Sequence, residues 1–467
     1  MSTAPDLFGS AYAAGVTEAL RPPPGEVARA EQPQAAAPPG AFALHGAVIT
    51  PMAALRRGYV VVDGGLIADV ATRRPQGVPV LETDGVILPG LIDLHGHPEF
   101  NVFAAWEPPT QFANRYRWRD SEVYQRLVRE PQNILLAALP PRTQLRYAEA
   151  RALVSGVTAI QGASGRTARA ADTEPLVRNI DLWIFGQHRA RAMIDLPSSR
   201  SGRSWTQLQS VLAAIEAGDV DTFYLHLCEG RRDDPRSQTE FARFVEFNAA
   251  TPATVVIHAS ALSRDQLGEL ADAGCKLVWS PQSNLRLYGE TTLAAEAIRR
   301  GMPVALGADW LPSGSTSLLA EMRVARRVLA DQGMPIPAAD LVGMVTAAAA
   351  HIAGLGDHLG ALTSGRPADI VVFERHHADP YENVCQAGPS EVELVLIGGD
   401  ITYGRDDWFT RLASVTTGTT IEALTAWGKR MRLDTGFQVH AGPPPPSLSA
   451  LRADLITHYP AVGPIFA

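Results

Sequence analysis

The stretch that decides the fold is residues 85–97, Gly-Val-Ile-Leu-Pro-Gly-Leu-Ile-Asp-Leu-His-Gly-His, an apolar run that ends in two histidines. Continuous apolar runs of this length are typical of strands that are buried on both faces, as in parallel sheets. Side chains two positions apart in a strand share a face, so His95 and His97 point the same way with Gly96 between them. The stretch therefore predicts a buried strand that delivers two imidazoles to one end of a parallel sheet.

Four later segments also place polar side chains at the end of an apolar, largely β-branched run. They are residues 225–229 (Leu-His-Leu-Cys-Glu), 256–258 (Val-Ile-His), 280–284 (Ser-Pro-Gln-Ser-Asn) and 306–309 (Leu-Gly-Ala-Asp). In a parallel barrel the carboxyl ends of the strands converge on the catalytic mouth. A divalent metal needs three or four nitrogen or oxygen ligands from separate elements, so the set predicts one hydrolytic metal site.

Glu229 can share a pocket with His226 only if the strand that carries His226 ends between the two residues. It follows His226 by three residues, so a continuing strand would turn it to the opposite face. The chain is therefore expected to leave β geometry near Cys228. A carboxylate on such a loop can sit beside a metal as a general acid/base. Cys228 shares a face with His226, and filling of the core is favoured for it over ligation of a second ion.

On these motifs the sequence resembles the amidohydrolase superfamily, in particular its mononuclear aminohydrolase branch. That branch includes guanine, cytosine and S-adenosylhomocysteine deaminases and the triazine hydrolases. Residues 89–93 and 360–372 also resemble family segments, and the resemblance covers about residues 41–405. It implies an α/β fold, a (β/α)8 TIM-like barrel with a discontinuous β-sandwich domain built from both flanks. It also implies a metal-dependent hydrolase that acts on a C–N bond other than a peptide bond.

The resemblance assigns a role to each residue of the site. One Zn²⁺ per chain is expected, with Fe²⁺ as the alternative, and Glu229 would transfer protons while His258 stabilises a developing oxyanion. Binuclear members bridge two metals with a carboxylated lysine at the end of strand four, but the only lysines here, Lys276 and Lys429, lie elsewhere. A mononuclear site is therefore expected. Its ligands would be His95, His97, His226 and Asp309, and the last of these is also expected to act in catalysis.

Four residues are candidates for substrate contact. Asn101 and Trp106 lie on an aromatic and arginine-rich connection after strand one, and Asn284 and Arg286 follow strand seven. Aromatic faces could stack on a planar heterocycle, and an arginine could hold a substrate carboxylate or phosphate. The alternatives are lid packing, a homodimer contact or capping of a turn. The residues after His97, Pro-Glu-Phe-Asn, depart from the usual apolar start of that loop in purine deaminases, which argues against guanine or adenosine-type substrates.

The favoured reaction is hydrolytic deamination of a small cyclic amidine or N-heterocycle with release of ammonia. Hydrolysis of a cyclic amide or imine, or displacement of chloride or an alkylamine as in the triazine branch, stays open as the alternative. The presence of Glu229 favours a poor leaving group that must be protonated. A non-catalytic scaffold is the remote alternative.

Composition limits the partners. The 467 residues are 46% hydrophobic, and the formal net charge of −8 with a pI near 5.9 argues against nucleic acid or an anionic membrane as the main partner. The three cysteines show no paired spacing, and the N-terminus has no signal-peptide pattern, so a cytoplasmic protein is expected. A small-molecule substrate and a homo-oligomer, a dimer, are the expected partners.

The chain divides into four expected parts by its composition and periodicity. Residues 1–40 are expected to be a flexible Ala/Pro-rich arm. Strands three and four are expected within 178–196, and Ser263 with Gln266 has the pattern of a capping box. The other expected parts are a composite β-sandwich (41–85 plus 357–405), the metal-dependent hydrolase barrel (86–356) and a C-terminal extension (406–467).

Overall fold

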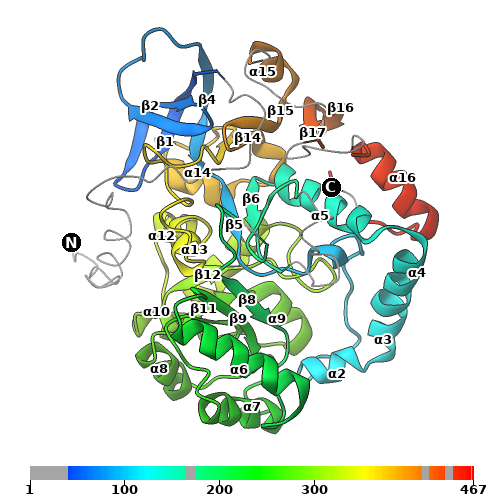
Figure 1. Cartoon of the computed structure of the whole chain (residues 1–467). Helices are drawn as coiled ribbons and strands as arrows, with labels where there is room; N and C mark the ends of the chain where they lie inside the picture. The colour runs from blue at the N-terminus through cyan, green and yellow to red at the C-terminus, as the bar shows by residue number, and fades with distance from the viewer. Residues whose placement is uncertain are drawn as a thin grey trace.

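In a computed structural model of the chain, the described residues are 40–162, 175–182, 184–412, 420–436, 445–463 and 465–466. The expected N-terminal arm lies outside these residues except for Gly40, and parts of the C-terminal extension lie outside them too. Two assemblies of strands form the core, a long curled sheet and a set of parallel strands surrounded by helices (Figure 1). None of the described helices has the length and apolar character needed to cross a bilayer.

Eight short parallel strands follow one another along the chain and form two arcs. The first arc has the order β5-β6-β7, and the second has the order β12-β11-β10-β9-β8. β6, β9, β10 and β12 are completely buried, as expected for apolar runs in a parallel sheet, whereas β8 has two residues that are partly or fully exposed. In chain order they are β5 (Leu91–Asp93), β6 (Val157–Ile160), β7 (Arg178–Asn179), β8 (Ala190–Met193), β9 (Thr222–Leu227), β10 (Thr254–His258), β11 (Lys276–Trp279) and β12 (Val304–Leu306).

The two arcs meet at one seam. Gly96 and Asp309 form a parallel bridge just beyond the ends of β5 and β12, and Leu94 N donates to Leu306 O over 3.4 Å. At the other seam, between β7 and β8, the described residues form no ladder. The mixed α/β character and the parallel strand order agree with the expected fold, but a closed hydrogen-bonded barrel is not observed. β7 and β8 lie within the range expected for strands three and four.

Helices cover the outside of the parallel strands, and others link them to the long sheet (Figure 1). In the expected capping box at the start of α8, Ser263 Oγ accepts from Gln266 N and Gln266 Oε1 accepts from Ser263 N, which confirms that motif. The α-helices are α2 (Arg115–Arg119), α3 (Glu122–Tyr124), α4 (Glu130–Ala138), α5 (Pro141–Val154), α6 (Gly202–Glu216), α7 (Pro235–Glu246), α8 (Arg264–Asp272), α9 (Pro281–Tyr288), α10 (Ala294–Arg299), α11 (Leu318–Asp331), α12 (Ala338–Gly343), α13 (Ala347–Ile352), α14 (Pro380–Gln386), α15 (Asp406–Arg411) and α16 (Leu448–His458); η1 (Pro98–Phe100) and η3 (Pro389–Glu391) are 3-10 turns, and η2 (Gln125–Arg129) is a π-helical turn.

The long sheet is built from both ends of the chain. Its nine strands have the order β16-β17-β15-β14-β13-β4-β1-β2-β3, so the C-terminal extension adds two strands to it. Alternate residues of strands from β2 to β15 share one apolar cluster, which means that the sheet curls around this cluster. The strands are β1 (Phe42–Ile49), β2 (Ala54–Asp63), β3 (Leu66–Ala71), β4 (Val80–Pro89), β13 (Ile370–Phe373), β14 (Val392–Ile397), β15 (Asp400–Arg405), β16 (Ile421–Ala426) and β17 (Lys429–Asp434).

The apolar run 85–93 is divided between the two assemblies. Its first part ends β4 in the long sheet at Pro89, and its second part forms β5 among the parallel strands. The division falls at Gly90, where a Cβ would lie only 2.1 Å from Thr158 Oγ1. Glycine therefore lets the chain pass close to β6 and places His95 and His97 just beyond β5.

Candidate functional site

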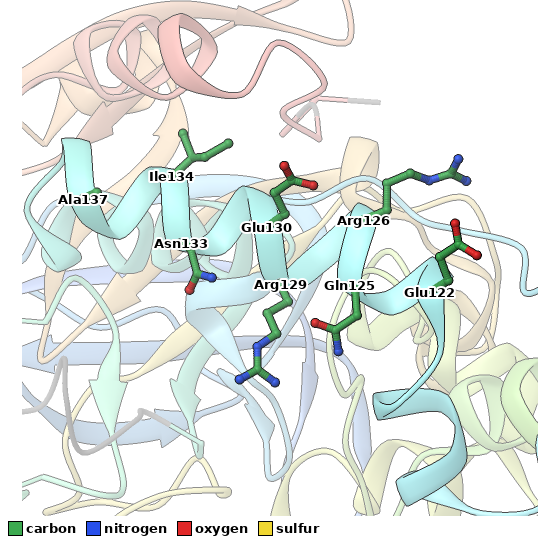
Figure 2. Close-up of a pocket in the computed structure, with 8 residues that line it drawn as sticks. All are labelled: Glu122, Gln125, Arg126, Arg129, Glu130, Asn133, Ile134 and Ala137. Carbon is green, nitrogen blue, oxygen red and sulfur yellow. The ribbon is translucent and has the colours of Figure 1, made fainter.

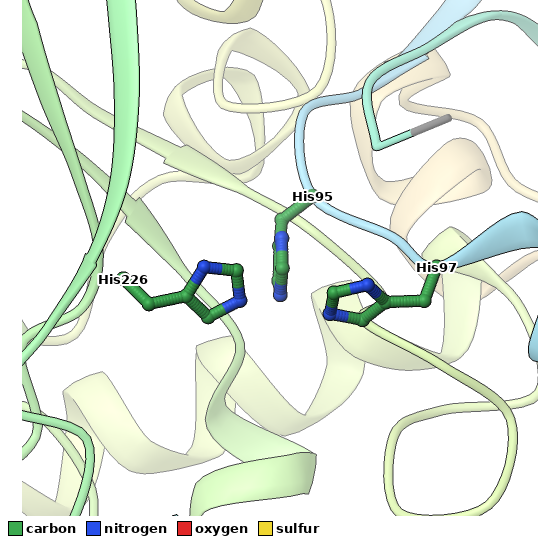
Figure 3. Close-up of side chains that lie close together, drawn as sticks. All are labelled: His95, His97 and His226. Carbon is green, nitrogen blue, oxygen red and sulfur yellow. The ribbon is translucent and has the colours of Figure 1, made fainter. Parts of the chain in front are cut away.

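Three histidines from two strands converge on one point. Figure 3 shows the rings of His95, His97 and His226 turned toward one another. The ring centroids of His95 and His97 are 5.1 Å apart, and those of His95 and His226 are 4.8 Å apart. One nitrogen from each of the three lies within 4.8 Å of the other two, a spacing that could hold a metal ion.

Asp309 and His258 complete the buried cluster. Asp309 Oδ1 lies 3.2 Å from His95 Nε2 and 3.7 Å from His97 Nε2. The ring centroids of His95 and His258 are 5.0 Å apart. The structure thus brings together all the residues that the sequence assigned to metal binding and catalysis. Only His97 in this set is partly open, with 25% of its side chain exposed.

The backbone turns sharply at the ends of three of the strands. Cys228, His258 and Asp309 have φ angles of +50°, +65° and +60°, in the left-handed region that residues with a Cβ rarely adopt. The turn at Cys228 is the departure from β geometry that brings Glu229 to the same pocket as His226. The Cys228 thiol donates to Ser237 O over 3.2 Å and lies in the core. Left-handed residues often mark functional sites, where the surrounding structure maintains the strain.

Close backbone packing fixes the position of His95. Asp93 Oδ1 accepts from His95 N (3.3 Å) and from Ala308 N (3.1 Å), which joins the ends of β5 and β12. A Cβ at Gly307 would lie 2.4 Å from His95 Cβ and 2.7 Å from His95 N. Only glycine fits at position 307 while His95 stays in place.

Burial keeps the imidazoles neutral. It lowers the pKa of His97 to about 4 and that of His258 to about 3, and it lowers the pKa of His226 well below the ordinary value. Nearby histidines add to the effect on His97 and His226. Burial by itself would raise the pKa of Asp309, but His95 and the other histidines lower it below the ordinary value. His97, His226 and His258 are therefore neutral and Asp309 is ionised, the forms that bind a metal.

The polar atoms of the cluster fit a divalent metal. Among the described residues, His95 Nε2, which faces Asp309, is buried without a hydrogen bond, and so are Nδ1 of His95 and Nδ1 of His226. Buried polar atoms are usually paired, so unpaired nitrogens at a point where several side chains converge need another explanation. Neutral imidazoles with a carboxylate are a common ligand set for zinc and iron. The residues present fit such an ion.

Glu229 is buried beside the histidines and held from two sides. Its side chain is 5% exposed, and Oε2 lies 3.7 Å from His258 Nε2. The Tyr288 hydroxyl donates to Oε1 over 2.5 Å. Burial raises the pKa of Glu229, while Arg115 and the Tyr288 hydrogen bond oppose the rise. Arg115 itself is 2% exposed and donates to Glu240 over 2.7 Å.

A chain of hydrogen bonds fixes which nitrogen of His258 carries the proton. Trp279 Nε1 donates to Thr291 Oγ1 over 2.9 Å, and the Thr291 hydroxyl donates to Asn284 Oδ1 over 3.1 Å. The amide nitrogen of Asn284 therefore faces His258 Nδ1, 2.9 Å away, and donates to it. Since Nδ1 is the acceptor, the proton of the neutral ring is on Nε2, which faces Glu229.

Three of the four candidates for substrate contact form side-chain hydrogen bonds within the protein, while Trp106 Nε1 is buried without a hydrogen-bond partner among the described residues. Asn101 Oδ1 accepts from Leu311 N over 2.8 Å, and Trp106 packs in a cluster with Leu287 and Tyr288. Asn284 contacts His258 as described above. Arg286 donates to the carbonyls of Ser313 and Gly314 over 3.2 and 3.3 Å. These contacts position loops around the site, and substrate contact by the four residues stays a prediction.

Sequence reasoning missed the residues that hold Glu229 in place. Tyr288 closes α9, and Trp118 lies on α2 in the aromatic and basic connection, where no spacing pattern relates them to Glu229. The aromatic and arginine-rich connection after strand one is a signal for Trp118, but it does not single this residue out, and it does not include Tyr288. Segment 113–115 pairs with the Glu229 loop, since Asn114 bridges Gly230 and Arg115 N donates to Glu229 O.

A separate hollow lies on the outer surface, along the helical segment α3-η2-α4 (Figure 2). All the residues that line it belong to residues 122–137, and both charge signs are present. None of the histidines or acidic residues of the cluster described above lines it.

Known proteins with similar sequences include several deaminases. The profile of the Amidohydrolase family matches residues 206–402. The 5-methylthioadenosine/S-adenosylhomocysteine deaminase of Teredinibacter turnerae is 29% identical over 205 residues, which cover 42% of this chain and 44% of that protein. The 5'-deoxyadenosine deaminase of Methanosarcina mazei is 22% identical over 395 residues, covering 74% of this chain and 88% of that protein. In the first of these alignments the chain spans less than half the length of its relative.

Solved structures share the fold. An adenosine deaminase from Xanthomonas campestris with bound zinc superposes with a TM-score of 0.61 at 18% identity, covering 79% of this chain and 94% of that chain. The guanine deaminase of E. coli superposes with a TM-score of 0.59 at 16% identity, covering 78% of this chain and 100% of that chain. An atrazine chlorohydrolase from Arthrobacter aurescens, complexed with zinc, gives a TM-score of 0.60 at 19% identity, covering 77% of this chain and 94% of that chain.

Proposed function

We propose that this chain, which carries an amidohydrolase-family domain, is a metal-dependent hydrolase that deaminates a small cyclic amidine or N-heterocycle. The products are ammonia and a carbonyl compound. The named deaminases among the relatives support this class of reaction. The two arcs of parallel strands are proposed to act as one (β/α)8 barrel, joined at the bridge between Gly96 and Asp309.

The proposed metal is one Zn²⁺ per chain. His95, His97, His226 and Asp309 would hold it, since they offer three imidazoles and one ionised carboxylate within a single buried cluster. When bound, such an ion lowers the pKa of water and stabilises negative charge. No lysine lies on β8, the fourth of the parallel strands, which supports one ion and not a bridged pair.

Glu229 is the proposed general acid/base. With Oε1 occupied by Tyr288, its other oxygen Oε2 accepts a proton from the attacking water. That proton then passes from Oε2 to the ring nitrogen, and the second proton of the water, left on the new hydroxyl group, passes through Oε2 to the departing amine, which leaves as ammonia. One C–O bond forms and one C–N bond breaks, and no net proton is consumed within the site.

His258 supplies a hydrogen bond to the substrate. Because Asn284 donates to Nδ1, the proton on Nε2 is available for the oxygen that develops negative charge at the reacting carbon. The pKa of His258, lowered by burial to about 3, keeps the ring a neutral donor at physiological pH.

The observation that carries the proposal is the convergence of three histidines, Asp309, Glu229 and His258 in one buried cluster. The test is ammonia release by the zinc-loaded protein with adenosine, 5'-deoxyadenosine, guanine, cytosine and melamine, which represent different aminated rings. Release that depends on metal and on Glu229 is the expected result. Metal-dependent release of chloride from chlorinated triazines without any ammonia would favour the alternative reaction. A protein that binds no zinc would refute the proposal.

A further inference from the structure

We propose that Trp118 and Tyr288 form a directional hydrogen-bond relay that fixes the orientation of Glu229, and that these two residues are positioning residues for its proton transfer. The inference rests on the proposed function and adds two residues to it. Trp118 Nε1 donates to the Tyr288 hydroxyl over 2.8 Å, and the Tyr288 hydroxyl donates to Glu229 Oε1 over 2.5 Å.

The chemistry of the three groups sets the direction of the relay. An indole N–H can only donate, so the Tyr288 oxygen must accept from Trp118. The single proton of the phenol is then left for Glu229, whose carboxylate is the acceptor. The reverse direction is excluded for the first bond, because the indole nitrogen cannot accept a hydrogen bond from the Tyr288 hydroxyl. Each bond therefore has one possible direction.

The relay gives the two oxygens of the Glu229 carboxylate different roles. Oε1 is committed to Tyr288, and Oε2 faces the histidine cluster, 3.7 Å from His258 Nε2. A carboxylate anchored at one oxygen cannot rotate freely, so the other oxygen remains aimed at the reacting atoms. Held geometry of this kind accounts for much of the effect of a positioned catalytic group.

Packing holds Trp118 and Tyr288 in place, and the Trp118 side chain is partly buried. Tyr288 is fully buried at the end of α9. The Trp118 ring packs on Trp310, the residue after Asp309, with centroids 5.3 Å apart, and on Tyr124 with centroids 5.1 Å apart. The position of α2 is thus transmitted to Glu229 through two hydrogen bonds.

The relay can be examined without any catalytic measurement. Trp118 is one of eight tryptophans, so labelling of the indole nitrogens with ¹⁵N gives a small set of NMR signals. Trp118→Phe removes one signal and so assigns it. In Tyr288→Phe the Trp118 signal is expected to shift upfield, because its acceptor is lost. In the control Tyr147→Phe, which removes a buried hydroxyl bonded to Gly463 O over 2.8 Å, that signal is expected to stay in place. An unshifted Trp118 signal in Tyr288→Phe would overturn the relay.

Steady-state kinetics test whether the relay contributes to catalysis. They are measured with the zinc-loaded enzyme and a probe heterocycle from which it releases ammonia. Tyr288→Phe is expected to lower kcat about tenfold to a hundredfold and to change KM less than about twofold, since a hydrogen bond to a charged group is lost while the ring is kept. Trp118→Phe is expected to lower kcat less. The double variant is expected to be no slower than Tyr288→Phe, because both changes act on one path. Zinc content is expected to equal that of the wild type.

The outcomes separate this inference from the proposed function. A wild type that releases no ammonia from any probe counts against the proposed deamination, and the NMR shift still decides whether the relay exists. Wild-type kcat in Tyr288→Phe, or multiplicative effects of the two substitutions, would overturn the positioning role even if the enzyme is a deaminase. Loss of zinc from Tyr288→Phe would also overturn it, because the residue would then act on the metal site.

Discussion

His95 Nε2 lies 3.2 Å from Asp309 Oδ1, although the two residues follow the first and the last of the eight parallel strands. The contact is supported by the backbone, since Asp309 N donates to His95 O over 2.9 Å. Three of the four proposed metal ligands, His95, His97 and Asp309, therefore lie at the seam that joins the two arcs of strands. Changes at this seam should affect metal binding and folding together.

Metal stoichiometry is the first prediction. We expect about one zinc per chain by elemental analysis, and lower occupancy in His226→Ala and Asp309→Ala, because each change removes one of the few ligands. His458→Ala, on the exposed side of α16, is the control and should keep full occupancy. Two tightly bound ions per chain would contradict the mononuclear assignment.

Replacement of Glu229 by glutamine separates chemistry from metal binding. The amide keeps the size of the side chain but cannot accept a proton from water at neutral pH. We expect kcat to fall on the order of 10²–10⁴-fold with zinc retained, the range typical for a general acid/base. The measurement is steady-state kinetics beside metal analysis, with Glu374→Gln, directly after β13 of the long sheet, as the control. Near-normal kcat in Glu229→Gln would point to a leaving group that needs no protonation.

Gly307→Ala tests the close packing against His95. The new Cβ would lie 2.4 Å from His95 Cβ, so His95 must move, and we expect reduced zinc occupancy with a loss of about 1–3 kcal/mol in the free energy of unfolding. Gly343→Ala is the matched control, since no atom lies within 4 Å of its Cβ position and it is in α12. Urea unfolding and metal analysis measure both effects. Wild-type zinc content in Gly307→Ala would show that the seam can relax.

Because the carboxyl group of Glu149 on α5 is buried, we expect the free energy of unfolding to depend on pH. Burial raises its pKa from the ordinary value of 4.5 to about 7, and its Oε2 accepts from Leu176 N over 2.9 Å. Between these values the folded protein holds a proton that the unfolded chain releases, so its contribution to stability is lost as the pH rises from about 4.5 to about 7. In Glu149→Gln the unfolding free energy should fall less over this range.

The measurement compares the wild type, Glu149→Gln and the exposed control Glu246→Gln by urea unfolding at several pH values. The expected difference between the wild type and Glu149→Gln is on the order of 1 kcal/mol or more, because one unit of pKa shift corresponds to about 1.4 kcal/mol. Parallel curves for these two proteins would mean that Glu149 is ionised in the folded state throughout the range.

The sequence predicted the parts of the site that depend on local geometry. The period of two in a strand places His95 and His97 on one face, and the ends of apolar runs identify His226, His258 and Asp309. It did not predict Trp118 or Tyr288, because their hydrogen bonds join helices that are distant in the chain and no periodicity relates them. Strand pairing was also incompletely predicted, since β16 and β17 join the long sheet through contacts that depend on the whole fold.

The origin of the long sheet from both ends of the chain has a consequence during synthesis. β4 ends at Pro89, but its antiparallel neighbour β13 begins at Ile370. At ribosomal speeds of about 5–20 residues per second, one edge of β4 remains unpaired on the order of tens of seconds after it leaves the ribosome. An unpaired apolar edge is a template for pairing with other chains, so the nascent protein needs dilution or a chaperone until β13 arrives.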